Sequence, residues 1–110
     1  TTGSTTQSMP FTLKLTGCPP GAASITFSGK ASEANSELLA LNDASQASNV
    51  AVEIRDRDKF RLPLQQASKD VKVDTQGNAT LSFYANYIAT ADNPEPGRAD
   101  ADATFMINYY

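Results

Sequence analysis

The chain has 110 residues, the size of one domain, and a formal charge of −3 from 9 basic and 12 acidic side chains. Large apolar side chains are few for a self-sufficient core, because Leu, Ile, Val and Phe together number 21 whereas Ala alone numbers 16. With no His and a single cysteine, Cys18, the sequence excludes Ser-His-Asp and Cys-His sites, nitrogen-ligated zinc and CxxC chemistry, and its scattered lysines form no basic stripe for nucleic acid.

Residues 1–9, TTGSTTQSM, are small and polar and show no period. They predict a polar N-terminal tail ahead of a folded region over residues 10–110, and we recognise no signal peptide among them. Membrane insertion is not expected either, because the longest apolar runs, residues 38–41 and 105–107, are far shorter than the roughly 20 residues that span a bilayer.

Three strands are predicted in the first half by apolar residues at alternate positions. The first begins at Pro10 and ends before the turn-forming run 17–21; its apolar residues are Phe11, Leu13 and Leu15. The second covers about residues 23–28, and the third covers residues 50–55 and ends in a charged turn at 56–59. Residues 61–73 alternate only in short stretches, and Pro63 excludes a central strand, so we expect edge fragments there.

Residues 34–41 leave an alternative open. Ala34, Leu38 and Leu41 fall at helical spacing, and residues 37–40 are good helix formers. A short helix here would interrupt an otherwise all-β chain.

The clearest alternation lies in the last third of the chain. Every odd position from 79 to 89 is apolar, and after the breaker 93–97 the odd positions from 101 to 109 are apolar again. Five or six short strands separated by turns indicate an antiparallel β-sandwich. The last strand reaches the end of the sequence with an apolar face, and as an edge it would invite another strand. With so thin a core, we expect a sheet that is completed from outside.

The C-terminal residues 96–110, PGRADADATFMINYY, closely resemble the ending of chaperone-usher pilin subunits, in which a proline-glycine turn leads to an alternating final strand with a penultimate tyrosine. Residues 10–18 are similar to the strand that carries the second cysteine of these subunits. Residues 38–41, 50–57 and 81–90 resemble the type 1 pilus rod subunit and its close relatives. The resemblance covers the chain except for the polar tail.

This resemblance implies an incomplete immunoglobulin-like sandwich, the pilin domain at residues 10–110, that lacks its final strand and is completed by a donor strand. Chaperone–pilin complementation is an established case of β-strand addition. The partners implied are a periplasmic pilus chaperone, an outer-membrane usher and neighbouring pilin subunits, and the location is an extracellular fimbrium assembled through the periplasm. The donor-strand groove would be formed by Phe11, Leu13, Leu15, Ala101, Ala103, Phe105, Ile107 and Tyr109. The chaperone would hold the terminal carboxylate of Tyr110.

The sequence also departs from the family pattern. Family members carry an N-terminal extension and a first strand whose cysteine pairs with the second cysteine, so Cys18 is expected to have lost its disulfide partner. Three interpretations follow: a deliberately shortened chain, a proteolysed core, or a subunit that accepts a strand without donating one. Shortening is favoured, because losing a disulfide costs a small secreted domain about 2–5 kcal/mol.

Other functions have weaker support. A pilus-tip or cell-surface carbohydrate-binding β-sandwich is the alternative, with Tyr109 and Tyr110 as its aromatic platform. Calcium or acid–base chemistry at Asp56 and Asp58, or at Asp100 and Asp102, is less consistent with the pattern than solvated turn charges. The sequon at residues 78–80 is a common three-residue match. We expect no enzyme and no cofactor.

Overall fold

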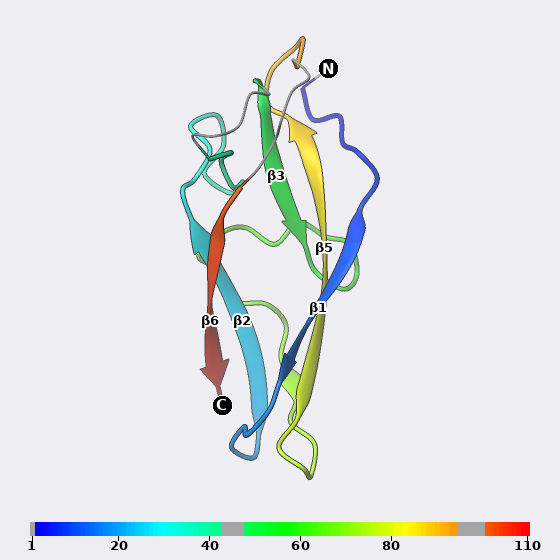
Figure 1. The fold of residues 1–110 in the computed structure, drawn as a ribbon, viewed down its shortest axis with the longest axis vertical. Coiled ribbons are helices and arrows are strands. Elements are labelled where there is room, and N and C mark those ends of the chain that lie inside the picture. The colour runs from blue at the N-terminus through cyan, green and yellow to red at the C-terminus, as the bar shows by residue number, and fades with distance from the viewer. Residues whose placement is uncertain (1, 43–47, 95–100) are drawn as a thin grey trace.

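The computed structural model describes residues 2–42, 48–94 and 101–110 and forms two antiparallel sheets that face each other (Figure 1). One sheet has the order β1-β5-β3 and the other β4-β2-β6. The strands are β1 (Met9–Leu15), β2 (Ala22–Gly29), β3 (Val50–Arg55), β4 (Val71–Lys72), β5 (Ala79–Ala89) and β6 (Ala103–Tyr109). The described residues contain no helix, and hence none that could cross a membrane. The predicted all-β sandwich is confirmed.

The predicted strands agree with the observed ones to within two residues at each end. The first strand begins one residue earlier than expected, at Met9, and the last begins at Ala103 rather than Ala101. β4 lies at a sheet edge, as the alternation of residues 61–73 and Pro63 predicted. The breaker at 93–97 lies partly outside the described residues, and Asp100 lies wholly outside them.

Residues 34–41 form turns and bridges rather than a helix. The side chain of Asn35 accepts a hydrogen bond from the Glu37 N–H, which is a local alternative to a helical turn. Leu39 then exchanges both backbone hydrogen bonds with Val52, each at 2.9 Å. Pairing with β3 therefore outweighs the helix propensity of this segment, and Leu38 and Leu39 are both buried, in two different clusters.

The core lies between the sheets and is centred on aromatic rings. Phe27 of β2 and Phe83 of β5 meet edge-to-face, with ring centroids 5.0 Å apart, and both are almost fully buried. Ile25 and Leu81 extend this layer along the same two strands. The alternation read from the sequence places these residues on the inner faces, as predicted.

A second, smaller cluster occupies the outer face of the β1-β5-β3 sheet. Leu38 covers Ala51 and Ile88 there. In the same region Asn86 is buried, whereas Tyr87, on the inner face of β5, is 40% exposed. The inner and outer faces of β5 are as the sequence predicted, but burial is reversed at Asn86 and Tyr87. The reason is that residues 34–41 cover the outer face while the inner face is open on one side.

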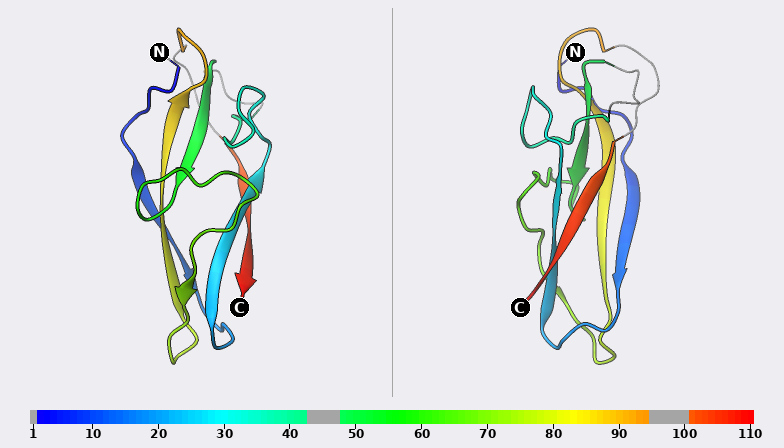
Figure 2. Two further views of the ribbon diagram at one scale, coloured as in Figure 1. Left: turned by 180° about the vertical axis from the view of Figure 1, so that it is seen from behind. Right: turned by 60° about the vertical axis from the view of Figure 1, so that its left-hand side comes forward.

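One side of the sandwich is closed by the chain itself. Residues 61–68 cross from one sheet to the other, as Figure 2 shows in the view from behind. Leu62 donates to the Ile54 carbonyl of β3, and Ser68 donates to the Ile25 carbonyl of β2, both at 2.8 Å. The opposite side, where β1 and β6 are the edge strands, is referred to below as the open side.

The polar tail is held against β5 through its backbone. The Gly3 N–H donates to the Ala89 carbonyl at 2.8 Å, and the Thr6 N–H donates to the Tyr87 carbonyl at 3.1 Å. The Thr6 hydroxyl adds a side-chain contact, because it accepts a hydrogen bond from the Tyr87 N–H at 3.0 Å. The alternation of apolar side chains does not report main-chain contacts of this kind. The tail thereby lies beside β5 on the same edge as β1 and extends the pairing beyond β1.

Candidate functional site

Alternate residues of β6 direct their backbone groups to opposite edges of the strand, and within the described part of the chain only one of these edges is paired. Tyr110 and Ala22 exchange backbone hydrogen bonds at 2.9 and 3.2 Å, so the even-numbered residues of β6 face β2. The backbone groups of the odd-numbered residues 103, 105, 107 and 109 therefore face away from β2. Within residues 2–42, 48–94 and 101–110 no further strand pairs with that edge. The side chains of these same residues point inward, toward the opposite sheet.

The free edge of β1 offers fewer backbone hydrogen-bonding groups than that of β6. The Thr90 N–H donates to the Asn49 carbonyl, so the backbone groups of the even residues of β5 hydrogen-bond to β3 and those of its odd residues to β1. The backbone groups of Phe11, Leu13 and Leu15 are therefore used by β5, and residues 10, 12 and 14 face outward. Pro10 has no N–H to donate. Of the two edges on the open side, that of β6 offers the longer uninterrupted ladder.

Four phenylalanine rings form an apolar layer that reaches the open side. Phe27 lies 6.1 Å from Phe11 of β1 and 6.4 Å from Phe105 of β6, measured between ring centroids. Phe11 also stacks on Phe83 at 5.5 Å. Phe105 is 48% exposed and Phe11 is half-buried, although both are the inward residues of their strands. A strand laid beside β6 would cover this surface.

A cavity of about 390 Å³ lies on the open side near the start of β6. Its lining is mostly apolar, and the segment before β1 and the small residues Ala101 and Ala103 close two of its walls. The lining residues are Thr6, Gln7, Met9, Leu39, Val52, Ala85, Asn86, Tyr87, Ala101 and Ala103. The cavity has room for a large apolar side chain.

At the other end of β6, Tyr109 and Tyr110 have different surroundings. The Cys18 thiol next to the Tyr109 hydroxyl raises the pKa of Tyr109 above its ordinary value. Cys18 is buried and is a free thiol. Tyr110 lies on the outer face, with its hydroxyl 3.1 Å from Ser24 Oγ. The two tyrosines are therefore on opposite faces and do not form the aromatic platform that the carbohydrate-binding alternative would use.

Gly21 allows the chain end to approach β2 closely. The residue has φ +129°, and a Cβ built on it would lie 2.0 Å from the carbonyl oxygen of Tyr110. No residue with a side chain fits this position without a backbone shift. The turn before β2 thus places Tyr110, the residue that follows β6.

The eight residues expected in the groove all come from the two edge strands of the open side or from the residues that lead into them. Leu15 is buried, Phe11, Leu13, Ala101 and Ile107 are half-buried against the core, and Ala103, Phe105 and Tyr109 are exposed. The sequence analysis did not find Leu39, Val52 and Tyr87 as part of this surface. Val52 and Tyr87 could have been predicted, because the alternation of their strands places both side chains on the inward face. Leu39 could not, because its segment was also consistent with a helix.

Glu53 is buried on the outer face of the β1-β5-β3 sheet and forms ion pairs with Arg55 and Arg61. Burial opposes ionisation of Glu53, but hydrogen bonds from Arg61, Asn86 and Arg55 outweigh it, so the pKa of Glu53 lies below its ordinary value. The distances to Glu53 oxygens are 2.8 Å from Arg61 Nε, 3.0 Å from Asn86 Nδ2 and 2.6 Å from Arg55 Nε. These contacts join β3, β5 and Arg61 of the crossing segment on the outer face of this sheet.

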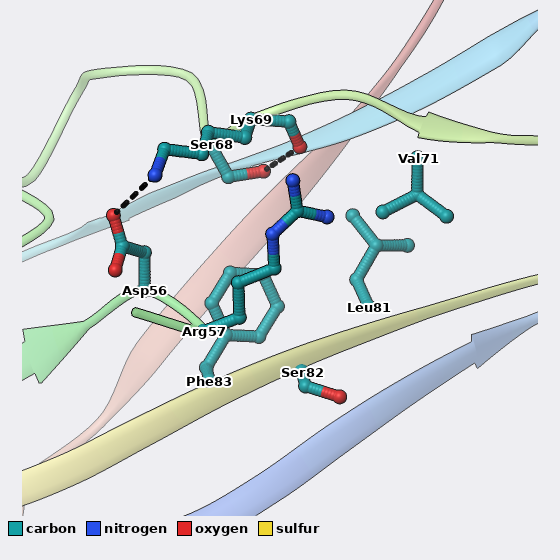
Figure 3. A pocket seen from close by; sticks show the side chains of 8 residues that line it. All are labelled: Asp56, Arg57, Ser68, Lys69, Val71, Leu81, Ser82 and Phe83. Atoms are coloured by element: carbon teal, nitrogen blue, oxygen red, sulfur yellow. Dashed lines mark hydrogen bonds and ion pairs between the residues drawn. The ribbon is translucent and has the colours of Figure 1, made fainter. Parts of the chain in front are cut away.

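The acidic pair Asp56 and Asp58 is engaged in the turn after β3. Asp56 accepts hydrogen bonds from the N–H groups of Asp58 and Phe60, and its other oxygen lies 3.8 Å from Lys69 Nζ. A hydrogen bond from Lys69 to Asp58 lowers the pKa of Asp58. The neighbouring cavity, drawn in Figure 3, has a volume of only about 20 Å³, room for one water molecule. This arrangement is a turn held by ion pairs.

Comparison with known proteins agrees with the geometry. The sequence model described as Fimbrial protein matches residues 1–110. The chain is 62% identical over 107 residues to the fimbrial-like protein FimF of Salmonella typhimurium, covering 97% of this chain and 62% of that protein. It is 38% identical over 114 residues to the fimbrial subunit type 1 of Salmonella typhimurium, with the same two coverages. The chain thus spans less than two thirds of these relatives.

Solved structures show the same fold. A Burkholderia pseudomallei antigen and type I fimbria protein superposes with a TM-score of 0.85 at 31% identity, covering 98% of this chain and 72% of that one. The P pilus rod subunit PapA superposes with a TM-score of 0.76 at 16% identity, covering 98% of this chain and 82% of that one.

Proposed function

The chain belongs to the fimbrial protein family, and from this premise we propose that it is a structural subunit of a chaperone-usher pilus whose open side accepts a β-strand from another chain. The accepted strand lies beside β6, between the two sheets. It comes from a periplasmic chaperone before assembly and from a neighbouring pilin subunit in the extracellular fimbrium, and an outer-membrane usher mediates the exchange.

The observation that carries this proposal is the coincidence of two properties on the same residues of β6. Residues 103, 105, 107 and 109 turn their backbone groups to the free edge and their side chains to the gap between the sheets. A strand that pairs with this edge therefore satisfies the backbone and covers Phe105 and Tyr109, which are 48% and 44% exposed. Main-chain hydrogen bonds give affinity, and alternate side chains of the donor give specificity.

The proposed accepting surface comprises Phe11, Leu13, Leu15, Ala101, Ala103, Phe105, Ile107 and Tyr109, together with the cavity near Ala101. At the far end, the carboxylate of Tyr110 is the group that a chaperone holds. Ala22 and Gly21 place this terminal residue. Cys18, in the turn after β1, is the thiol that pairs with a cysteine of a first strand added beside β1.

The test is thermal unfolding of the chain, followed by circular dichroism, with and without a peptide copied from the N-terminal extension of a type 1 pilin. A ligand that binds only the folded state stabilises it by about 2.7 kcal/mol at 100 times its dissociation constant. We expect a higher midpoint and a one-to-one complex. A matched peptide, N-methylated at every second residue so that the N–H groups facing β6 are lost, keeps the side chains and should bind far less.

The outcomes separate the proposals. Equal binding of both peptides would mean that side chains alone are recognised, and strand pairing with β6 would be wrong. A cooperative chain indifferent to either peptide would contradict strand acceptance and favour a self-sufficient sandwich, such as a carbohydrate-binding module.

A further inference from the structure

The apolar face of β6 does not by itself fix the register of this strand on β2. Its inward residues are Ala103, Phe105, Ile107 and Tyr109, and two of them are almost half exposed. A slip by two residues, about 7 Å, that brings Ile107 opposite Ala23 would again place an apolar side chain opposite each inward position of β2. The inward face therefore distinguishes poorly between the observed register and a slipped one.

The outer face of β6 distinguishes the observed register from a slipped one. Polar side chains of both strands line this face as the β2–β6 polar row, which consists of two hydrogen-bonded groups, Ser24, Thr26 and Asn108 in one and Ser28 and Thr104 in the other. Asn108 Nδ2 donates to Thr26 Oγ1 at 3.0 Å and to Ser24 Oγ at 3.2 Å. Ser28 and Thr104 pair at the other end of the row, at 2.8 Å.

The burial of Ser24 makes the row sensitive to register. Ser24 is fully buried although it lies on an outer face, and its hydroxyl also meets the hydroxyl of Tyr110. A two-residue slip in one direction would bring Met106 opposite Ser24 in place of Asn108. The thioether of methionine cannot donate a hydrogen bond, and a buried hydroxyl that loses its partners is costly.

We propose that Asn108 is a positioning residue: it fixes the register of β6 on β2 and thereby aligns the free backbone edge of β6 with the inward side chains of β1. This inference rests on the proposed strand acceptance, because it assigns to the outer face the task of holding the accepting edge in place while no strand covers the inner one. Asn108 itself faces away from the accepting surface and makes no contact with the accepted strand.

The register can be read directly by NMR. Since Ala22 and Tyr110 are a hydrogen-bonded pair, Ile25 and Ile107 form a non-hydrogen-bonded pair whose α-protons are close enough for a strong cross-peak. In Asn108→Val we expect a second cross-peak, from Ile25 to Phe105 or to Tyr109. Met106→Val is the matched control, because Met106 is an exposed outer-face residue of the same strand, and it should keep the single native cross-peak.

Binding of the pilin peptide provides the second measurement. If about a fifth of the Asn108→Val molecules keep the native register, the apparent dissociation constant rises about fivefold. Ser24→Ala removes the same contact from β2 and serves as the second variant if Asn108→Val does not fold. A single native cross-peak in the folded variant overturns the inference, whatever its affinity. If the unchanged chain binds no peptide, the proposed function fails, while the cross-peaks still decide the register.

Discussion

Phe105 separates strand acceptance from ordinary core packing, since its ring is 48% exposed while it touches the core through Phe27. Full burial of a phenylalanine side chain contributes about 1.5–3 kcal/mol. An accepted strand would bury roughly the exposed half, so Phe105→Ala should weaken peptide binding by about 0.7–1.5 kcal/mol, or about three- to tenfold. Phe105→Asp should weaken it further, because the strand would cover a carboxylate that has no partner.

Isothermal titration with the pilin peptide measures this effect, and Phe60→Ala is the matched control. Phe60 is 69% exposed and follows β3 in the turn that Asp56 caps, away from β6. Phe60→Ala should leave the affinity unchanged. If Phe105→Ala and Phe105→Asp both bind the peptide as the unchanged chain does, the ring is not covered on binding and the accepting surface is assigned to the wrong side.

Three further predictions concern stability and titration. The pKa of Glu53 is lower in the folded than in the unfolded state, so its contribution to stability is complete above the unfolded pKa of about 4.3 and is lost as the pH falls through the folded pKa. In urea unfolding between about pH 3 and 6, the free energy of unfolding of Glu53→Gln should therefore change less with pH than that of the unchanged chain. An equal pH dependence would contradict the role of the groups that hydrogen-bond to Glu53. Gly21→Ala should cost more than about 1 kcal/mol and reduce the exchange protection of the Tyr110 amide, whereas retained protection would show that the turn tolerates a Cβ. Cys18→Ala should lower the pKa of Tyr109 toward about 10 in an NMR titration, and a pKa that stays raised would mean that the thiol is not its cause.

The sequence determined the strands because their cause is local. Alternation at residues 11–15, 50–55 and 79–89 has a period of two, and no other regular structure satisfies it. The same alternation identified Phe105, Ile107 and Tyr109 as inward-facing. Recognition of the C-terminal residues as pilin-like then assigned the family before any contact was known.

The tertiary structure decided which faces were covered and which edges were left open. Residues 34–41 have helix propensity, yet pairing of Leu39 with Val52 places them over the outer face of a sheet, where they bury Ile88. Pairing of the tail with β5 is mostly between backbone groups and leaves no alternation of apolar side chains in the sequence. The register of β6 depends on Asn108 meeting Ser24 across 84 residues of sequence, and the free edge exists only because no described segment returns to that side. Periodicity is set by neighbouring residues, whereas closure, register and exposure are set by residues that meet only after the sheets have packed.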